Sequence, residues 1–226
     1  LKLEPEQCYI CSCPLVLKYA YQLDSLDASL FYPPHVPAYP DFLDLVRSMW
    51  EQIRQRDVLL FYPYHSMQSF LDLLRQSAAD PAVLSIQMTV YRLAKKSSVV
   101  KYLCAAAENG KSVTVLVELR ARFDESNNIA WAKELEEAGC RVIYGPNHYK
   151  CHGKICLITR REKSGLWYIT QIGTGNYNEK TAALYTDFSL MTADRDIGAD
   201  GVAFFQNLLI GDLQGSYRKL LVAPVS

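Results

Sequence analysis

The 226-residue sequence lacks several features that would place it in a broad class. It has no run approaching the roughly 20 apolar residues of a membrane span, and no basic segment followed by an apolar one at its start. Neither charge is in excess, because 24 basic and 24 acidic residues cancel. We therefore expect a cytoplasmic protein without a transmembrane segment, with peripheral binding at the inner membrane left open, and no general affinity for nucleic acid.

The cysteines also lack a regular framework. Seven are present, and an odd number in a chain of this size argues for free thiols in a reducing compartment. Cys8, Cys11 and Cys13 lie close together in the sequence, but a zinc site usually needs a second pair of ligands, and no matching Cys or His cluster follows. We assign this group a structural or incidental role.

The distribution of prolines divides the chain near residue 40. Six of the ten prolines fall within residues 1–40, which is typical of a linker or of the end of a preceding domain. The chain begins with Leu1 rather than Met, and residues 8–21 are strongly apolar. We interpret it as a segment of a longer protein, with a new domain over residues 41–226.

From residue 41 onward the hydrophobic spacing alternates between helical and strand-like periods. Helices are predicted over 42–56, after Ser66, and over 98–109, 129–138 and 202–209, and strands over 58–62, 83–91, 113–117, 141–144, 154–159, 167–172 and 188–191. The first part predicts βαβ units in a largely parallel sheet, and the strands from 154 onward predict an antiparallel hairpin. The fold class is therefore α/β, with a mixed sheet flanked by helices.

His152 and Lys154 are the strongest candidates for chemistry. They stand two residues apart at the start of a strand, so their side chains share one face. Gly173-Thr-Gly-Asn176 ends the next strand, and Arg92 and Arg122 follow two others. Ligands of open α/β sheets bind at the carboxyl ends of strands, so we expect these groups to meet at one edge.

Each of these residue types suits a phosphate group. Histidine has an ordinary pKa of about 6.5, so its neutral, nucleophilic form is well populated. Arginine binds phosphate oxygens in pairs, lysine supplies a compact charge, and glycine lets backbone N–H groups approach an oxyanion. The set predicts phosphoryl transfer through a phosphohistidine, although Arg92 and Arg122 could instead pair with carboxylates such as Glu118. His35, His65 and His148 are assigned to loops.

The same residues resemble a known signature. His152-Gly-Lys154 with Gly173-Thr-Gly-Asn176 is similar to the HxK and GSxN motifs of the phospholipase D superfamily, whose histidine forms a covalent phospho-enzyme. The acidic residue usual five positions beyond the lysine is replaced by Thr159, which disfavours a standard phosphodiesterase. Longer strings are more specific: YPYH at 62–65, VYR at 90–92, VELRARFDE at 117–125, IGTGNYNEKT at 172–181 and LYTD at 184–187. Together they closely resemble bacterial ATP-dependent polyphosphate kinases, from about residue 40 to the end.

The resemblance implies a domain organisation and a reaction. Residues 1–40 would be the tail of a head domain, and residues 41–226 the first C-terminal phospholipase D-like domain, without the second C-terminal and the N-terminal domains. His152 would take the γ-phosphate of ATP and pass it reversibly to inorganic polyphosphate, releasing ADP. The family builds its site from two such lobes, so this chain alone is expected to have little or no kinase activity, and the full-length protein is expected to be a homo-oligomer.

The resemblance also implies roles for the other candidates. Lys154 and Asn176 would stabilise the transferring phosphoryl group, and Tyr185 would contact the nucleotide. Arg92 and Arg122 would grip phosphates bridged by Mg²⁺, since a guanidinium cannot itself ligate a cation. Two alternatives stay open: a single-motif phosphodiesterase or nuclease that homodimerises, and a non-catalytic polyphosphate-binding module.

Overall fold

The computed structural model divides the chain into two units, residues 1–35 and 36–226. It describes residues 4–12, 16, 22–23, 29, 31–91, 93–94, 96–118, 125–145, 150–212 and 214–223, with the backbone alone for 125–127. The first unit contains the short helix η1 (Pro5–Gln7). Cys8 and Cys11 are exposed, free thiols in this unit, and Cys13 lies outside the described residues. The assignment of residues 1–40 to a preceding domain stays a prediction.

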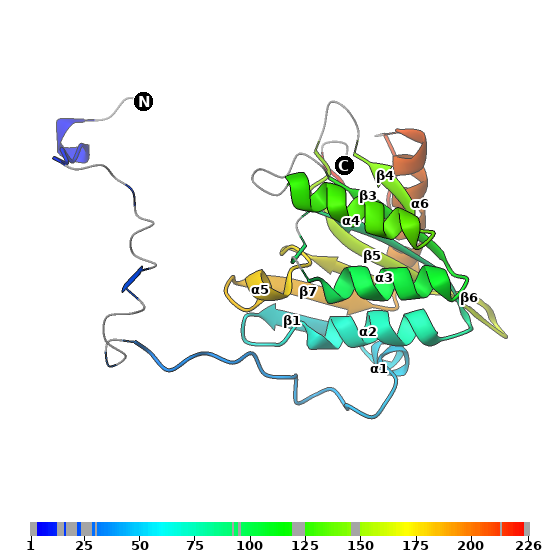
Figure 1. Cartoon of the computed structure of the whole chain (residues 1–226). Coiled ribbons are helices and arrows are strands. Elements are labelled where there is room, and N and C mark those ends of the chain that lie inside the picture. Colours follow the sequence, from blue (N-terminus) through cyan, green and yellow to red (C-terminus); the bar gives the residue numbers. More distant parts are fainter. Residues whose placement is uncertain are drawn as a thin grey trace. The chain divides into compact units, whose positions relative to one another are not determined.

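The second unit is built on a seven-stranded mixed sheet (Figure 1). In chain order its strands are β1 (Val58–Tyr62), β2 (Val83–Val90), β3 (Ser112–Val117), β4 (Arg141–Tyr144), β5 (Lys154–Glu162), β6 (Gly165–Gly173) and β7 (Asp187–Thr192). Their spatial order is β1-β7-β6-β5-β2-β3-β4. The predicted mixed sheet with a β5–β6 hairpin is confirmed. The expectation of a largely parallel sheet in the first part of the domain is wrong for β1, which pairs antiparallel with β7 because the three later strands insert between β1 and β2. Among the named strands, parallel pairing joins only β2 to β3 and β3 to β4.

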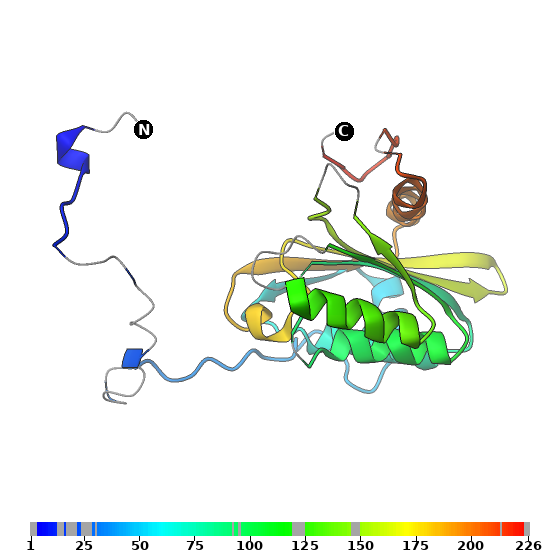
Figure 2. The same cartoon turned by 45° about the horizontal axis from the view of Figure 1, so that its top comes forward.

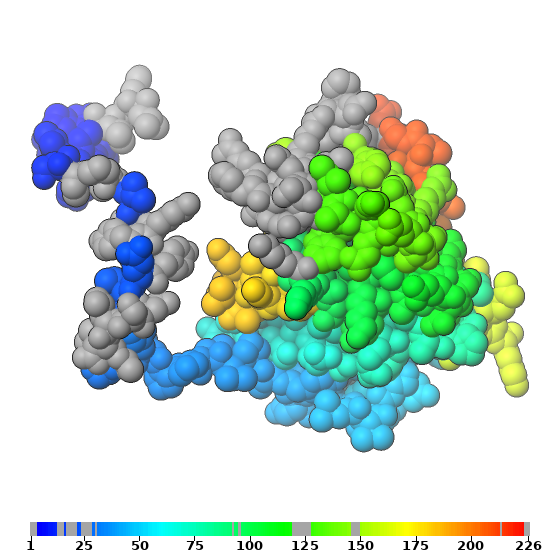
Figure 3. All heavy atoms as spheres, in the orientation of Figure 1, coloured from blue at the N-terminus to red at the C-terminus, as the bar shows by residue number. Residues whose placement is uncertain are grey.

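Helices lie on both faces of this sheet. They are α1 (Met49–Gln55), α2 (Gln68–Ala79), α3 (Ser98–Glu108), α4 (Glu125–Glu137), α5 (Glu179–Ala182) and α6 (Arg195–Ile210). Figure 2 shows α2, α3 and α4 on one face and α6 on the other, and Figure 3 shows the outer surfaces of α2 to α4 side by side. The main core lies beneath the first group and includes Phe70, Met88 and Leu103. A smaller core beneath α6 is centred on Leu157 and Phe205.

The first helix is shorter than its apolar spacing predicts. Residues 42–48 are not helical, and α1 begins at Met49. Local side chains satisfy the backbone there: the Asp44 carboxylate accepts from the N–H of Val46 at 2.8 Å, and the Gln52 amide accepts from the Asp44 N–H at 2.8 Å and donates to the Asp44 carbonyl at 2.9 Å. Such bonds compete with helix formation, so the predicted start at residue 42 is wrong.

The last helix is longer than predicted, since α6 begins at Arg195 rather than near residue 202. Asp194 caps it by accepting from the N–H groups of Asp196 at 2.9 Å and Ile197 at 3.0 Å. Gly198 weakens the helical pattern in the sequence but is needed for packing, because a Cβ atom there would lie 2.7 Å from the Cβ of Tyr168. In the part of the chain that is described, no helix is both long and apolar enough to cross a membrane.

Candidate functional site

One edge of the sheet collects the segments that carry the candidate residues. The pairings orient β1, β2, β3, β4 and β6 in one direction and β5 and β7 in the other. The carboxyl ends of β2, β3 and β6 therefore lie beside the starts of β5 and β7. Lys154, the first residue of β5, pairs with Gly173, the last residue of β6. This edge brings His152, Lys154 and the glycine-rich turn after Gly173 into one region, as the strand pattern predicts.

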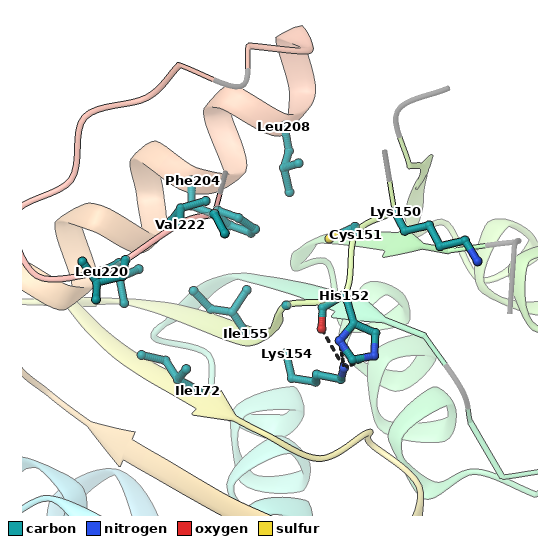
Figure 4. Close-up of a pocket in the computed structure, with 13 residues that line it drawn as sticks. Lys150, Cys151, His152, Lys154, Ile155, Ile172, Phe204, Leu208, Leu220 and Val222 are labelled. Carbon is teal, nitrogen blue, oxygen red and sulfur yellow. Dashed lines mark hydrogen bonds between the residues drawn. The ribbon is translucent and has the colours of Figure 1, made fainter. Parts of the chain in front are cut away.

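Lys154 and His152 are in direct contact at this edge (Figure 4). The Lys154 ammonium lies 3.0 Å from both ring nitrogens of His152, Nδ1 and Nε2, and donates to the His152 carbonyl at 2.6 Å. The lone-pair directions of the two ring nitrogens diverge, so equal distances place the ammonium beside the ring rather than in line with either nitrogen. Lys154 is 5% exposed, whereas His152 is exposed. The two side chains therefore meet, as their spacing predicts, although β5 begins at Lys154 and His152 precedes it.

The Tyr91 ring lies against both side chains of this contact. Its ring meets the His152 ring edge-on, with centroids 5.1 Å apart and planes at 76°, and the Lys154 ammonium lies 5.6 Å from its centroid. Tyr91 follows β2 directly, so the end of one strand fixes the orientation of a ring at the start of another. In the sequence Tyr91 stands out only as part of the VYR string, and its contact with His152 could not be read from spacing.

Burial changes the acidity of two groups next to His152. Desolvation lowers the pKa of Lys154, and the nearby Cys151 and Asp187 oppose this shift. Desolvation also raises the pKa of the Cys151 thiol to about 11, so the thiol stays protonated at neutral pH. Because this thiol is protonated, His152 is a better nucleophile than the adjacent Cys151. The backbone at Cys151 is also held in place, since its N–H donates to the buried carboxylate of Glu118 at 3.0 Å.

The glycine-rich turn after β6 is held by the start of β7. The Thr174 hydroxyl donates to the Asp187 carboxylate at 2.8 Å and accepts from the Phe188 N–H at 2.9 Å. Asn176 lies in the same turn, and its buried Oδ1 atom has no hydrogen-bond partner among the described residues. Asp187 is thus a site residue that side-chain spacing did not reveal, and the role of Asn176 stays a prediction.

A substitution at Gly175 would measure how tightly this turn packs against Asp187. A Cβ atom at position 175 would lie 2.5 Å from the Asp187 carboxylate oxygen Oδ2 and 2.9 Å from its Cβ. We expect Gly175→Ala to lower the free energy of unfolding by about 1–3 kcal/mol, measured by urea denaturation, because the turn or Asp187 must move. Gly153→Ala is the matched control, since nothing lies within 4 Å of its added Cβ. Equal stability of the two variants would contradict the packing seen here.

The remaining residues named from the sequence are Tyr185, Arg92, Arg122, His148 and His65. Tyr185 lies between α5 and β7 with its side chain 63% exposed, which leaves it accessible to a ligand. Arg92, Arg122 and His148 lie outside the described residues, so their predicted roles stay predictions. His65, which the sequence assigned to a loop, has a structural role, because its Nδ1 accepts from the Phe61 N–H at 3.0 Å.

A largely apolar pocket of about 530 Å³ opens beside His152 on the α6 face (Figure 4). Its apolar lining includes Ile155, Ile172, Phe204, Leu208, Leu220 and Val222. The segment after α6 is fastened by Asp200, whose buried carboxylate accepts from the N–H groups of Arg218, Lys219 and Leu220 at 2.7–3.0 Å. Burial acts to raise the pKa of Asp200, but these bonds hold it below its ordinary value. The pocket wall is therefore anchored to the fold.

Thr159, where related motifs carry an acid, lies away from these groups. It is nearly buried in β5 and pairs with Ser85 and Tyr168. Five residues of strand separate it from Lys154 by about 17 Å. Thr159 therefore lies within the sheet rather than beside His152.

The chain has a phospholipase D-like α/β fold, with the His–Lys pair at the edge of its sheet. A solved phospholipase D family member, Nuc from Salmonella typhimurium, superposes with a TM-score of 0.53 over 73% of this chain and 99% of that one, at 17% identity. That likeness shows the fold. A closer match is the crystal structure of polyphosphate kinase from Porphyromonas gingivalis, with a TM-score of 0.72 at 36% identity, covering 84% of this chain and 29% of that one.

The sequence comparisons give the family. The family model for the polyphosphate kinase C-terminal domain 1 matches residues 48–212, and the chain belongs to this family. Polyphosphate kinase from Bacillus anthracis is 43% identical over 228 residues, which covers 99% of this chain and 32% of that protein. The enzyme of Neisseria meningitidis serogroup B is 45% identical over 195 residues, covering 86% and 28%. The chain spans about a third of the length of these relatives.

Proposed function

We propose that this chain is the part of a polyphosphate kinase that carries the nucleophile. The observation that supports this most directly is the contact of Lys154 with His152 at an exposed sheet edge. An exposed imidazole can reach a phosphoryl group, and a buried ammonium beside it can stabilise negative charge on that group. Membership of the family supports ATP and inorganic polyphosphate as the proposed substrates.

The reaction has two phosphoryl transfers. A neutral ring nitrogen of His152 attacks the γ-phosphorus of ATP, a nitrogen–phosphorus bond forms, and the bond from the γ-phosphorus to its bridging oxygen breaks to release ADP. A terminal oxygen of polyphosphate then attacks the phosphohistidine, which lengthens the polymer by one phosphate and frees the imidazole. Lys154 and Asn176 contact the transferring group, Tyr185 contacts the nucleotide, and Arg92 and Arg122 bind phosphate oxygens.

Magnesium is proposed to enter with the phosphates. Among the described residues, no group of three or more His, Cys, Asp or Glu side chains is arranged to hold a metal ion, so direct coordination by these residues does not fit. When bound to ATP, Mg²⁺ neutralises charge on the phosphate oxygens. The binding and orientation steps assigned to this chain depend on its own cationic side chains.

The location and assembly of the protein are also proposed. The described cysteines are all free, which fits a reducing compartment such as the cytoplasm. We also propose peripheral association with the inner membrane and assembly into homo-oligomers. The balanced charge of the chain supports the further proposal that nucleic acid is not its substrate.

The function is tested by incubating the complete gene product with γ-labelled ATP and Mg²⁺. We expect acid-labile, base-stable label on the protein, which is chased into polymer by added polyphosphate and back into ATP by ADP. The 226-residue chain alone is expected to make little or no polymer. Hydrolysis of bis(p-nitrophenyl) phosphate without any phospho-enzyme would favour a phosphodiesterase, and polyphosphate binding without label would favour a binding module.

A further inference from the structure

Thr89 lies where β2 and β5 separate. The antiparallel pairing of these strands ends at Met88 and Cys156, one position before Thr89. Two residues later, Tyr91 has left the strand and packs its ring against His152. The backbone at the start of β5, which carries His152 and Lys154, therefore needs another partner on this side.

The side chain of Thr89 supplies that partner. Its hydroxyl donates to the Gly153 carbonyl at 2.6 Å and accepts from the Ile155 N–H at 3.1 Å. Thr89 is 2% exposed, so water does not compete for these bonds. The two backbone groups belong to the peptide units on either side of the Lys154 Cα atom. One hydroxyl thus fixes both peptides that set the direction of the Lys154 side chain.

Lys154 in turn contacts the proposed nucleophile, His152. On its other side Lys154 pairs with Gly173 of β6, so its backbone is held from two neighbouring strands. Its ammonium donates to the His152 carbonyl at 2.6 Å and touches the imidazole ring. A shift of the Lys154 backbone would therefore move both the cation and the histidine it contacts.

We propose that Thr89 is a positioning residue for phosphoryl transfer, acting through the backbone of Lys154 rather than by contact with substrate. This inference rests on the function proposed above. Valine has nearly the same shape as threonine but neither donates nor accepts a hydrogen bond, so Thr89→Val would leave the Ile155 N–H without its partner and loosen the start of β5. Serine keeps the hydroxyl and should preserve the arrangement.

The test compares Thr89→Val, Thr89→Ser and Thr170→Val in the complete gene product. Thr170 is a matched control because it is equally buried, in β6, and its hydroxyl has no hydrogen-bond partner among the described residues. We expect Thr89→Val to lower kcat and the single-turnover rate of histidine phosphorylation by roughly tenfold to a hundredfold, with KM for ATP changed by less than about twofold. Thr89→Ser and Thr170→Val should both stay within about threefold of the wild type.

A second measurement distinguishes a failure of the proposed role of Thr89 from a failure of the proposed function. Hydrogen exchange of the Ile155 amide should be faster in Thr89→Val than in the wild type, and unchanged in Thr89→Ser. Normal phosphorylation of Thr89→Val in a wild-type protein that does form phosphohistidine would overturn the positioning role alone. A change in KM without a change in kcat, or unaltered Ile155 exchange, would overturn it as well. Absence of phosphohistidine in the wild type would overturn the function, and the positioning role with it.

Discussion

The variant His152→Ala in the complete gene product should form no acid-labile label from γ-labelled ATP and should make polyphosphate at least about a thousandfold more slowly than the wild type. The large effect follows from the loss of the atom that would form the covalent bond. The neighbouring thiol is not a substitute, because burial raises the pKa of Cys151 to about 11. Quantitative phosphoprotein labelling and a polymer assay would measure the two losses.

His65→Asn is the matched control for that variant. His65 also belongs to the second unit, but its ring accepts from the Phe61 N–H and packs edge-on against Phe42. Its replacement should lower the melting temperature and leave the amount of label per folded molecule unchanged. Label that persists in His152→Ala would assign the nucleophile to another residue and contradict the proposed chemistry.

Much of the fold could be predicted from local pattern. The strands β1, β2 and β5 are apolar enough to be recognised, and each lies within a residue or a few of its predicted bounds. The errors fall where side chains or packing override periodicity. Asp44 and Gln52 bind the backbone that the apolar spacing at 42–48 would otherwise make helical. Gly198, which reads as a helix breaker, is tolerated because α6 must approach Tyr168 closely.

The site could be predicted in part for the same reason. The His152–Lys154 spacing is local, so a contact between these side chains could be expected from the sequence, although His152 precedes β5 rather than lying within it. The contacts of Thr89 and Tyr91 could not be derived, because they join residues about 60 positions apart and depend on β5 lying next to β2. Strand order is set by the packing of the whole sheet rather than by the residues of either strand.

Lys154→Met should separate the function of this lysine from its effect on stability. Phosphoryl transfer is expected to fall by about a hundredfold to a thousandfold, the usual effect of removing one group that stabilises transition-state charge. The free energy of unfolding should be unchanged or higher. Burial lowers the pKa of Lys154 in the folded protein, so the unfolded chain binds this proton more tightly. The buried charge therefore destabilises the fold at neutral pH.

The dependence on pH gives this prediction a sharper form. The destabilisation is fully present below the lowered pKa of the folded state and disappears as the pH rises past the ordinary lysine value of about 10.4. Any stability gained by Lys154→Met should thus shrink at alkaline pH, where wild-type transfer should also decline as the ammonium loses its proton. Lys163→Met, in the exposed β5–β6 turn, should change neither property. A clear loss of stability in Lys154→Met at neutral pH would show instead that the lysine holds this edge of the sheet together, and that slower transfer in this variant reflects a disordered site.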